Sequence, residues 1–182
     1  MAKILTVFFS LKGENHGADE QTVYLAKGYT AVAAGFIQKT VGGDIFEIKT
    51  VKNYSRDYLG MLYEAQEEQE NGIRPELREY VDIDDYDIIY LGYPNWWLSL
   101  PMAVVSFLEH YDWSGKRVIV FVTSGGGGFG NSIKEIRKIC TGIDILAAGH
   151  FLGYQVEDSE QEISEWAKTE LTKAEGVSPN GL

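Results

Sequence analysis

The chain has 182 residues, of which 45% are hydrophobic, and its 16 basic and 27 acidic side chains give a formal net charge of −11. A surface this acidic repels nucleic acids and anionic membranes, and no apolar run approaches the roughly 20 residues that a membrane helix needs, so neither is expected as a partner. With one cysteine, Cys140, and no secretory signal pattern, the chain is predicted to be a cytoplasmic protein with one domain at residues 1–176 and a flexible tail at 177–182.

In chain order, strand-like segments alternate with helix-like segments. The predicted strands are residues 3–9, 44–49, 86–93, 116–122 and a fifth within 143–152. The predicted helices are residues 18–38, 101–109, 131–139 and 159–175, with an additional helical insertion at 58–70. Continuous apolar strands are typical of parallel sheets that helices cover on both faces. Right-handed crossovers between such strands predict an α/β fold with a three-layer, doubly wound, five-stranded parallel sheet.

The first predicted strand ends in a polar loop that precedes the first predicted helix. Its candidate ligand-binding residues are Ser10, Lys12, Gly13, Glu14 and Asn15, with His16 beside them. Free N–H groups at a helix start, helped by the helix dipole, can hold a phosphate. The spacing is neither G-x-x-x-x-G-K-[ST] nor G-x-G-x-x-G, which disfavours the usual ATP and dinucleotide sites. A phosphate cradle and an ordinary polar strand–helix turn are both open readings of this loop.

The third predicted strand ends in a loop that places two adjacent tryptophans between two prolines. Its candidate ligand-binding residues are Pro94, Asn95, Trp96, Trp97, Leu98 and Ser99. Large aromatic side chains on a loop are costly to expose, and their flat faces can pack on a planar ligand. The alternative is that one or both tryptophans pack into the core or into a subunit contact.

The fourth predicted strand ends in a loop with four consecutive glycines. Its candidate ligand-binding residues are Thr123, Ser124, Gly125, Gly126 and Gly128. Glycines let the backbone approach a ligand closely, although such a run is also found in flexible connectors. Ligands of open parallel sheets bind beyond the carboxyl ends of the strands. The three loops are therefore predicted to form one site for a phosphorylated planar cofactor.

These loops, together with Pro101-Met102 and Phe107-Leu108-Glu109, resemble those of the flavodoxin-like family, and in particular its short-chain flavodoxins and FMN-binding flavoproteins. The resemblance covers about residues 3–166. It implies a flavodoxin-like fold with strand order 2-1-3-4-5 and one non-covalently bound FMN.

The resemblance also implies a division of roles among the loops. Residues 10–15 would hold the FMN phosphate, 94–99 would line the polar edge and one face of the ring, and 123–128 would close the other side. Flavodoxin phosphate loops follow a T/S-x-T/S-G-x-T/S pattern, from which this chain departs at Lys12 and Asn15. Lys12 can offset phosphate charge and Asn15 can donate a hydrogen bond.

Three functions are compatible with these residues. No acid–base pair or nucleophile is evident, so the flavin would carry the redox chemistry. The first hypothesis is an electron-transfer flavodoxin whose redox partners have basic surfaces. The second is an NAD(P)H-dependent FMN oxidoreductase with a quinone-like acceptor. The third is a flavin-free binding or signalling module, which ranks below the others because Phe9-Ser10 and Tyr93-Pro94 occupy the positions where receiver domains carry acidic residues.

Overall fold

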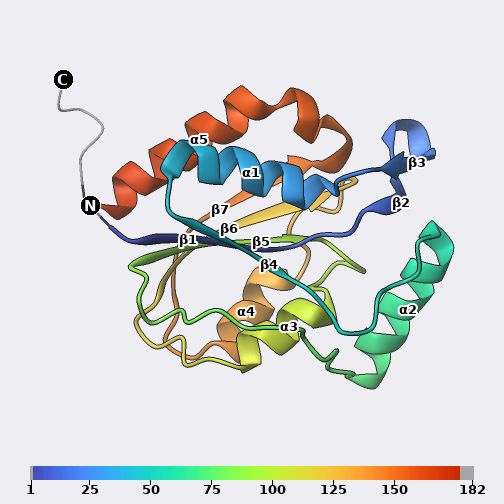
Figure 1. Ribbon diagram of the computed structural model, residues 1–182, viewed down its shortest axis with the longest axis horizontal. Coiled ribbons are helices and arrows are strands. Elements are labelled where there is room, and N and C mark those ends of the chain that lie inside the picture. The colour runs from blue at the N-terminus through green and yellow to red at the C-terminus, as the bar shows by residue number, and fades with distance from the viewer. Residues whose placement is uncertain (1, 177–182) are drawn as a thin grey trace.

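The computed structural model describes residues 2–176 and has a five-stranded parallel sheet at its centre, with helices on both faces (Figure 1). The sheet strands are β1 Ile4–Phe9, β4 Asp44–Ile48, β5 Ile88–Pro94, β6 Arg117–Ser124 and β7 Asp144–Leu152. Their order is β4-β1-β5-β6-β7, with every neighbouring pair parallel. This is the predicted 2-1-3-4-5 order, so the three-layer doubly wound fold is confirmed. The predicted tail at 177–182 lies outside the described residues.

The helices divide between the two faces of the sheet (Figure 1). Helices α1 Tyr29–Val41 and α5 Glu160–Ala174 pack together over one face. Helices α3 Met102–Glu109 and α4 Ser132–Ile139 lie over the other face. Helix α2 Tyr58–Asn71 is the helical insertion predicted before β5, and it stands at the side of the molecule next to the strands β2 Gly13–His16 and β3 Thr22–Leu25 (Figure 1). None of the described helices combines the length and the apolar character needed to cross a membrane.

Strand β1 shows why the sheet is buried on both sides. All six of its residues are buried, with Leu5, Val7 and Phe9 in the core under α3 and α4, and Ile4 and Phe8 in the core under α1 and α5. Successive side chains of a strand point to opposite faces, so one continuous apolar run supplies both cores. Burying each large apolar side chain contributes about 1.5–3 kcal/mol before conformational entropy is subtracted.

The predicted helix at 18–38 is wrong in its first half. Residues Gly13–His16 form strand β2, which pairs antiparallel with strand β3 at Thr22–Leu25, and a 3₁₀ turn, Ala18–Glu20, connects them. In β3 the exposure alternates with a period of two, which suits a β-branched and aromatic segment better than a helix does. The hairpin therefore separates β1 from α1, which begins only at Tyr29.

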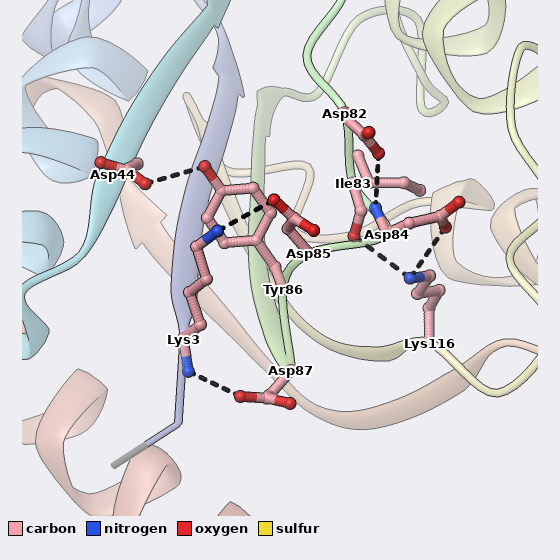
Figure 2. A network of polar contacts seen from close by, with 9 residues as sticks. All are labelled: Lys3, Asp44, Asp82, Ile83, Asp84, Asp85, Tyr86, Asp87 and Lys116. Carbon is pink, nitrogen blue, oxygen red and sulfur yellow. Dashed lines mark hydrogen bonds and ion pairs between the residues drawn. The ribbon is translucent and has the colours of Figure 1, made fainter.

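A polar network joins the amino ends of the strands, opposite the candidate site (Figure 2). The Lys3 ammonium pairs with Asp85 at 3.1 Å, and the Tyr86 hydroxyl donates to Asp44 at 2.8 Å. Lys116 donates to the Ile83 carbonyl at 3.1 Å and pairs with Asp84 at 3.0 Å. These pairs are mostly exposed, so each adds at most about 1 kcal/mol, and together they fix how the strands enter the sheet.

Candidate functional site

A cleft of about 400 Å³ opens beyond the carboxyl ends of β5 and β6. The structure brings ten of the sixteen predicted site residues to its walls: Asn15, Pro94, Asn95, Trp96, Trp97, Leu98, Thr123, Ser124, Gly125 and Gly126. The hairpin, the start of α1, α2 and Gly153 supply the remaining lining residues, so the cleft is built from six separate parts of the chain. Whether these residues contact a cofactor remains a prediction.

The other six predicted residues lie beside the cleft or away from it. Ser10 and Lys12 line a neighbouring cavity. Gly13 is buried in the hairpin, and the Glu14 carboxylate accepts a hydrogen bond from the Tyr58 N–H at 3.0 Å. Ser99 bonds to the Glu135 carboxylate, and the Gly128 carbonyl accepts from the Asn95 amide at 2.7 Å.

The two adjacent tryptophans have different environments. Trp96 is 7% exposed and packs edge-on against Phe9 and Tyr54, with ring centroids 5.3 Å apart in both pairs. Trp97 is 48% exposed, and its indole N–H donates to the Leu62 carbonyl of α2 at 3.0 Å. Trp96 therefore packs into the core, which is the alternative considered for the two tryptophans. Trp97 is the tryptophan that can offer a flat face to a ligand.

The turn that carries Trp97 is strained. Trp96 and Ser99 exchange backbone hydrogen bonds of 3.2 and 2.9 Å across it. The two central residues, Trp97 and Leu98, have φ angles of 51° and 58°, a left-handed conformation that such hairpin turns normally give to Asn and Gly. Each such residue costs about 1–2 kcal/mol. The surroundings hold the turn in place, since Asn131 donates its N–H to the Leu98 carbonyl at 2.7 Å.

Hydrogen bonds hold the glycine loop, the segment after β6 that contains Gly125–Gly128. The Ser124 hydroxyl oxygen receives the N–H groups of Gly126 and Gly128 at 3.1 and 3.2 Å and lies 2.8 Å from Nε2 of His150. The Asn95 side chain donates to the Gly127 and Gly128 carbonyls from the opposite wall. Positive φ angles of 140° at Gly126 and 56° at Gly128 explain why glycine is needed there. The loop therefore presents a hydrogen-bonded backbone surface, which favours the ligand-binding interpretation over a flexible connector.

His16 of the hairpin lacks a partner for one buried atom. Among the described residues, its Nδ1 atom is buried without a hydrogen-bond partner, and a Cβ placed on Gly125 would lie 3.1 Å from it. His16 lines the cleft together with Tyr29, whose hydroxyl donates to the His16 carbonyl at 3.2 Å. Buried polar atoms are nearly always hydrogen-bonded, so this nitrogen indicates a polar group of a ligand or a water.

The start of α1 offers further unpaired donors. The first N–H groups of a helix have no partner within the helix. Here the Ala31 N–H donates to the Ser10 hydroxyl at 3.1 Å and the Val32 N–H to the Gly28 carbonyl at 3.1 Å. Within residues 2–176, the N–H groups of Tyr29 and Thr30 are left without an acceptor. The Thr30 hydroxyl lies 2.7 Å from that of Thr123, which fixes the helix start against the end of β6.

Helix α2 is the outer wall, and polar contacts attach it. Tyr54 donates to the Glu68 carboxylate and the Ser55 N–H donates to Glu64, both at 2.7 Å. Burial, followed by the bond to Glu68, raises the pKa of Tyr54 far above its usual range. Burial also raises the pKa of Glu68. Only Met61 and Ala65 of α2 are buried, so this wall depends on hydrogen bonds more than on apolar packing.

A family model described as Flavodoxin matches residues 3–170. The chain belongs to the flavodoxin family. No curated protein sequence matches it. A candidate flavoprotein from Bacteroides eggerthii DSM 20697 is 27% identical, with a TM-score of 0.73 over 94% of this chain and 99% of that one. A second, from Bacteroides uniformis ATCC 8492, is 27% identical, with a TM-score of 0.71 over 92% of this chain and 98% of that one.

A more distant structure shares the flavodoxin fold. The flavoprotein of Lactobacillus acidophilus NCFM, solved in complex with FMN, is 16% identical to this chain. Its TM-score is 0.61 over 90% of this chain and 99% of that one. At this identity the similarity demonstrates a common fold.

The flavodoxin phosphate pattern is present here in two pieces. Its first hydroxyl is Ser10, and its G-x-T end matches Gly28-Tyr29-Thr30, immediately before α1. The hairpin lies between the two pieces, yet a Cβ on Gly28 would lie only 2.3 Å from the Ser10 hydroxyl and the Leu11 carbonyl. The departure assigned to Lys12 and Asn15 is thus an effect of the insertion. The signal that reveals these residues is a G-x-T triplet directly before an alanine-rich helix.

Proposed function

We propose that this flavodoxin-family protein binds FMN non-covalently in the cleft and acts as an electron-transfer protein. The observation that carries the proposal is the combination in one cleft of a half-exposed flat side chain, Trp97, with unpaired polar groups of His16 and Tyr29. A planar ring with a phosphate on a chain requires this combination. The shared fold with the Lactobacillus acidophilus flavoprotein, which is solved with FMN, supports the same ligand.

The residues present fit FMN. The unpaired N–H groups of Tyr29 and Thr30 stand at the positive end of the α1 dipole and would hold the phosphate. The buried Nδ1 of His16 would bond to a polar group of the ligand. Trp97 would cover one face of the ring, and the exposed backbone at Gly125 and Gly126 would approach its edge. Bound FMN supplies a ring that accepts and returns electrons, while these residues orient it and restrict water.

Electron transfer to a partner with a basic surface is supported by the charge near the cleft. The turn of the hairpin carries Asp19 and Glu20, and α2 carries Glu67 and Glu70, all exposed. With the net charge of −11, these residues would attract a basic surface and repel an acidic one. Steering of this kind is weakened by salt.

The first test is the visible absorption of the purified protein after FMN is added and unbound FMN is removed. Flavin bands at about one FMN per chain are expected. A protein that stays colourless would contradict the FMN proposal and leave the flavin-free hypothesis in place.

A second test separates a carrier from an oxidoreductase. The FMN-loaded protein is reduced chemically and mixed with a basic redox protein such as cytochrome c at increasing salt. A carrier should transfer electrons at a rate that falls with ionic strength and should consume NADPH slowly. Rapid NADPH oxidation with a quinone, at a rate insensitive to salt, would instead establish the NAD(P)H-dependent oxidoreductase.

A further inference from the structure

Trp96 connects the wall of the cleft to a second aromatic residue, Tyr54, that lies outside it. Trp96 lines the cleft, and its indole ring packs edge-on against the phenol ring of Tyr54, with ring centroids 5.3 Å apart. Tyr54 is only 8% exposed and is not part of the cleft lining. Because electron transfer between aromatic rings slows steeply with distance, two rings in contact form a path for single electrons between the cleft and Tyr54.

A base stands at the far end of Tyr54. The Tyr54 hydroxyl donates to the Glu68 carboxylate at 2.7 Å. A phenol that loses an electron becomes a strong acid, so the oxidation of a tyrosine near neutral pH requires a group that takes the phenolic proton. A carboxylate at hydrogen-bond distance can take this proton. Glu68 also lines a cavity of about 420 Å³ outside the cleft, through which the proton can reach solvent.

Other tyrosines of the chain do not combine these two contacts. Four of them donate their hydroxyls to carbonyl or hydroxyl oxygens, which take no proton near neutral pH: Tyr29, Tyr90, Tyr93 and Tyr111. Tyr86 does donate to a carboxylate, that of Asp44, but it lies at the amino ends of the strands, opposite the cleft (Figure 2). Within residues 2–176, Tyr54 is the tyrosine that has both a cleft residue against its ring and a carboxylate at its hydroxyl.

We propose that Trp96, Tyr54 and Glu68 form a relay that carries a one-electron oxidation out of the cleft, an inference that rests on the proposed binding of FMN there. Trp96 gives one electron to light-excited FMN, which is the one-electron oxidant. Tyr54 then returns one electron to Trp96 and passes its phenolic proton to Glu68. The net change is one electron moved from Tyr54 to the cleft and one proton moved from Tyr54 to Glu68. Trp96 is restored, and a neutral radical remains on Tyr54.

The relay protects the wall of the cleft from oxidative damage. Without it, the oxidised indole of Trp96 would persist beside the ligand. With it, the oxidation rests on Tyr54, which borders the 420 Å³ cavity together with Glu68. A small reductant such as a thiolate can supply one electron there, and Glu68 returns the proton to the phenol.

The test is flash photolysis of the FMN-loaded protein, in which transient absorption and electron paramagnetic resonance distinguish tryptophan radicals from tyrosine radicals. In the wild type, a tyrosine radical is expected to replace a tryptophan radical. Tyr54→Phe should stop at the tryptophan radical, and Trp96→Phe should lose the tyrosine radical. Glu68→Gln can accept the Tyr54 hydrogen bond but not its proton, so the tyrosine radical should form at least about tenfold more slowly. The matched control is Tyr86→Phe, which removes the other tyrosine bonded to a carboxylate and should leave both radicals unchanged.

Three results would overturn the relay. These are a tyrosine radical that persists in Tyr54→Phe, an unchanged rate in Glu68→Gln, and an equal loss in Tyr86→Phe. A failure of FMN to bind has a separate signature, because the protein then shows no flavin absorption. In that case the same variants are oxidised with flash-generated ruthenium(III) tris(bipyridine), a soluble one-electron oxidant. A tyrosine radical that depends on Tyr54 and Glu68 would support the relay although FMN binding had failed, and one that does not depend on them would overturn it.

Discussion

The Ser124 hydroxyl donates its hydrogen to Nε2 of His150, 2.8 Å away. This direction follows from counting, because a hydroxyl can donate one hydrogen bond and accept two. Both accepting positions of Ser124 are filled by the N–H groups of Gly126 and Gly128. Nε2 must therefore be the acceptor, which makes His150 neutral with its proton on Nδ1. The shape of the glycine loop thus depends on an uncharged histidine outside the cleft.

The first prediction concerns pH. Burial lowers the pKa of His150 below its usual value of about 6.5. The folded state therefore favours the neutral imidazole. The contribution of this neutral imidazole to the free energy of unfolding is complete above about pH 6.5 and is lost as the pH falls through the folded-state pKa. FMN affinity and the free energy of unfolding should fall together over this window. FMN titrations and urea unfolding at a series of pH values measure both quantities.

The control for this prediction is His150→Gln, whose amide oxygen can accept from Ser124 without titrating. The variant should retain FMN affinity and should lose the part of the pH dependence below about 6.5. An unchanged pH profile in the variant would show that His150 does not set the loop.

The second prediction separates the two tryptophans. Trp96→Ala removes a buried side chain packed on Phe9 and Tyr54, and it should lower the free energy of unfolding by about 3–5 kcal/mol. Trp97→Ala should change stability by less than about 1 kcal/mol but weaken FMN roughly tenfold. Urea unfolding and fluorescence titration of the two variants test the contrast. Equal effects of both variants on stability would refute the assignment of Trp97 to the ligand.

A third prediction concerns strain in the Trp97–Leu98 turn. Asn tolerates the left-handed conformation better than Leu does. Because Leu98 is 58% exposed with a φ of 58°, Leu98→Asn should raise the free energy of unfolding of the FMN-free protein by about 1 kcal/mol. Leu98→Ala is the control, since it removes the same apolar atoms and keeps the Cβ penalty. A gain of equal size in both variants would mean that relief of strain is not the cause.

The fourth prediction compares Gly28, the residue directly before α1, with Gly35 in the middle of the same helix. Gly28→Ala would place a Cβ 2.3 Å from the Ser10 hydroxyl and the Leu11 carbonyl, so the two pieces of the phosphate pattern must separate. This variant should lose far more affinity for FMN than for riboflavin. Gly35→Ala in the middle of α1 meets only the mobile end of Lys27, at 3.3 Å, and should stabilise the protein by about 0.5–1 kcal/mol. An equal loss of FMN and riboflavin in Gly28→Ala would argue against a phosphate site at the start of α1.

The sheet was predictable from the sequence because its signals are local. Five of the six residues of β1 are apolar, so the run Ile4–Phe9 indicates a central strand without reference to the rest of the chain. The three-layer architecture then followed from right-handed crossovers, and the order of the strands from the family resemblance.

The hairpin was not predictable in the same way. Its position depends on a distant segment, since the Glu14 N–H donates to the Arg56 carbonyl at 3.1 Å and the Glu14 carboxylate accepts from Tyr58. These contacts override the helical spacing of Val23 and Ala26, and a sequence pattern does not contain them. The different burial of Trp96 and Trp97 was also not predictable from the sequence pattern, because the backbone angles of one turn decide which of the two side chains is buried.

Because Ser10 and Leu11 lie against Gly28, the hairpin leaves the fold and returns to it at nearly the same point. Changing the length of such a closed excursion costs little, about 0.6 kcal/mol for each doubling of a flexible loop. The hairpin nevertheless supplies Asn15 and His16 to the cleft. The hairpin is therefore a local excursion of the chain whose residues reach the cleft, so substitutions within it are expected to act on the cleft while the strand order of the sheet stays the same.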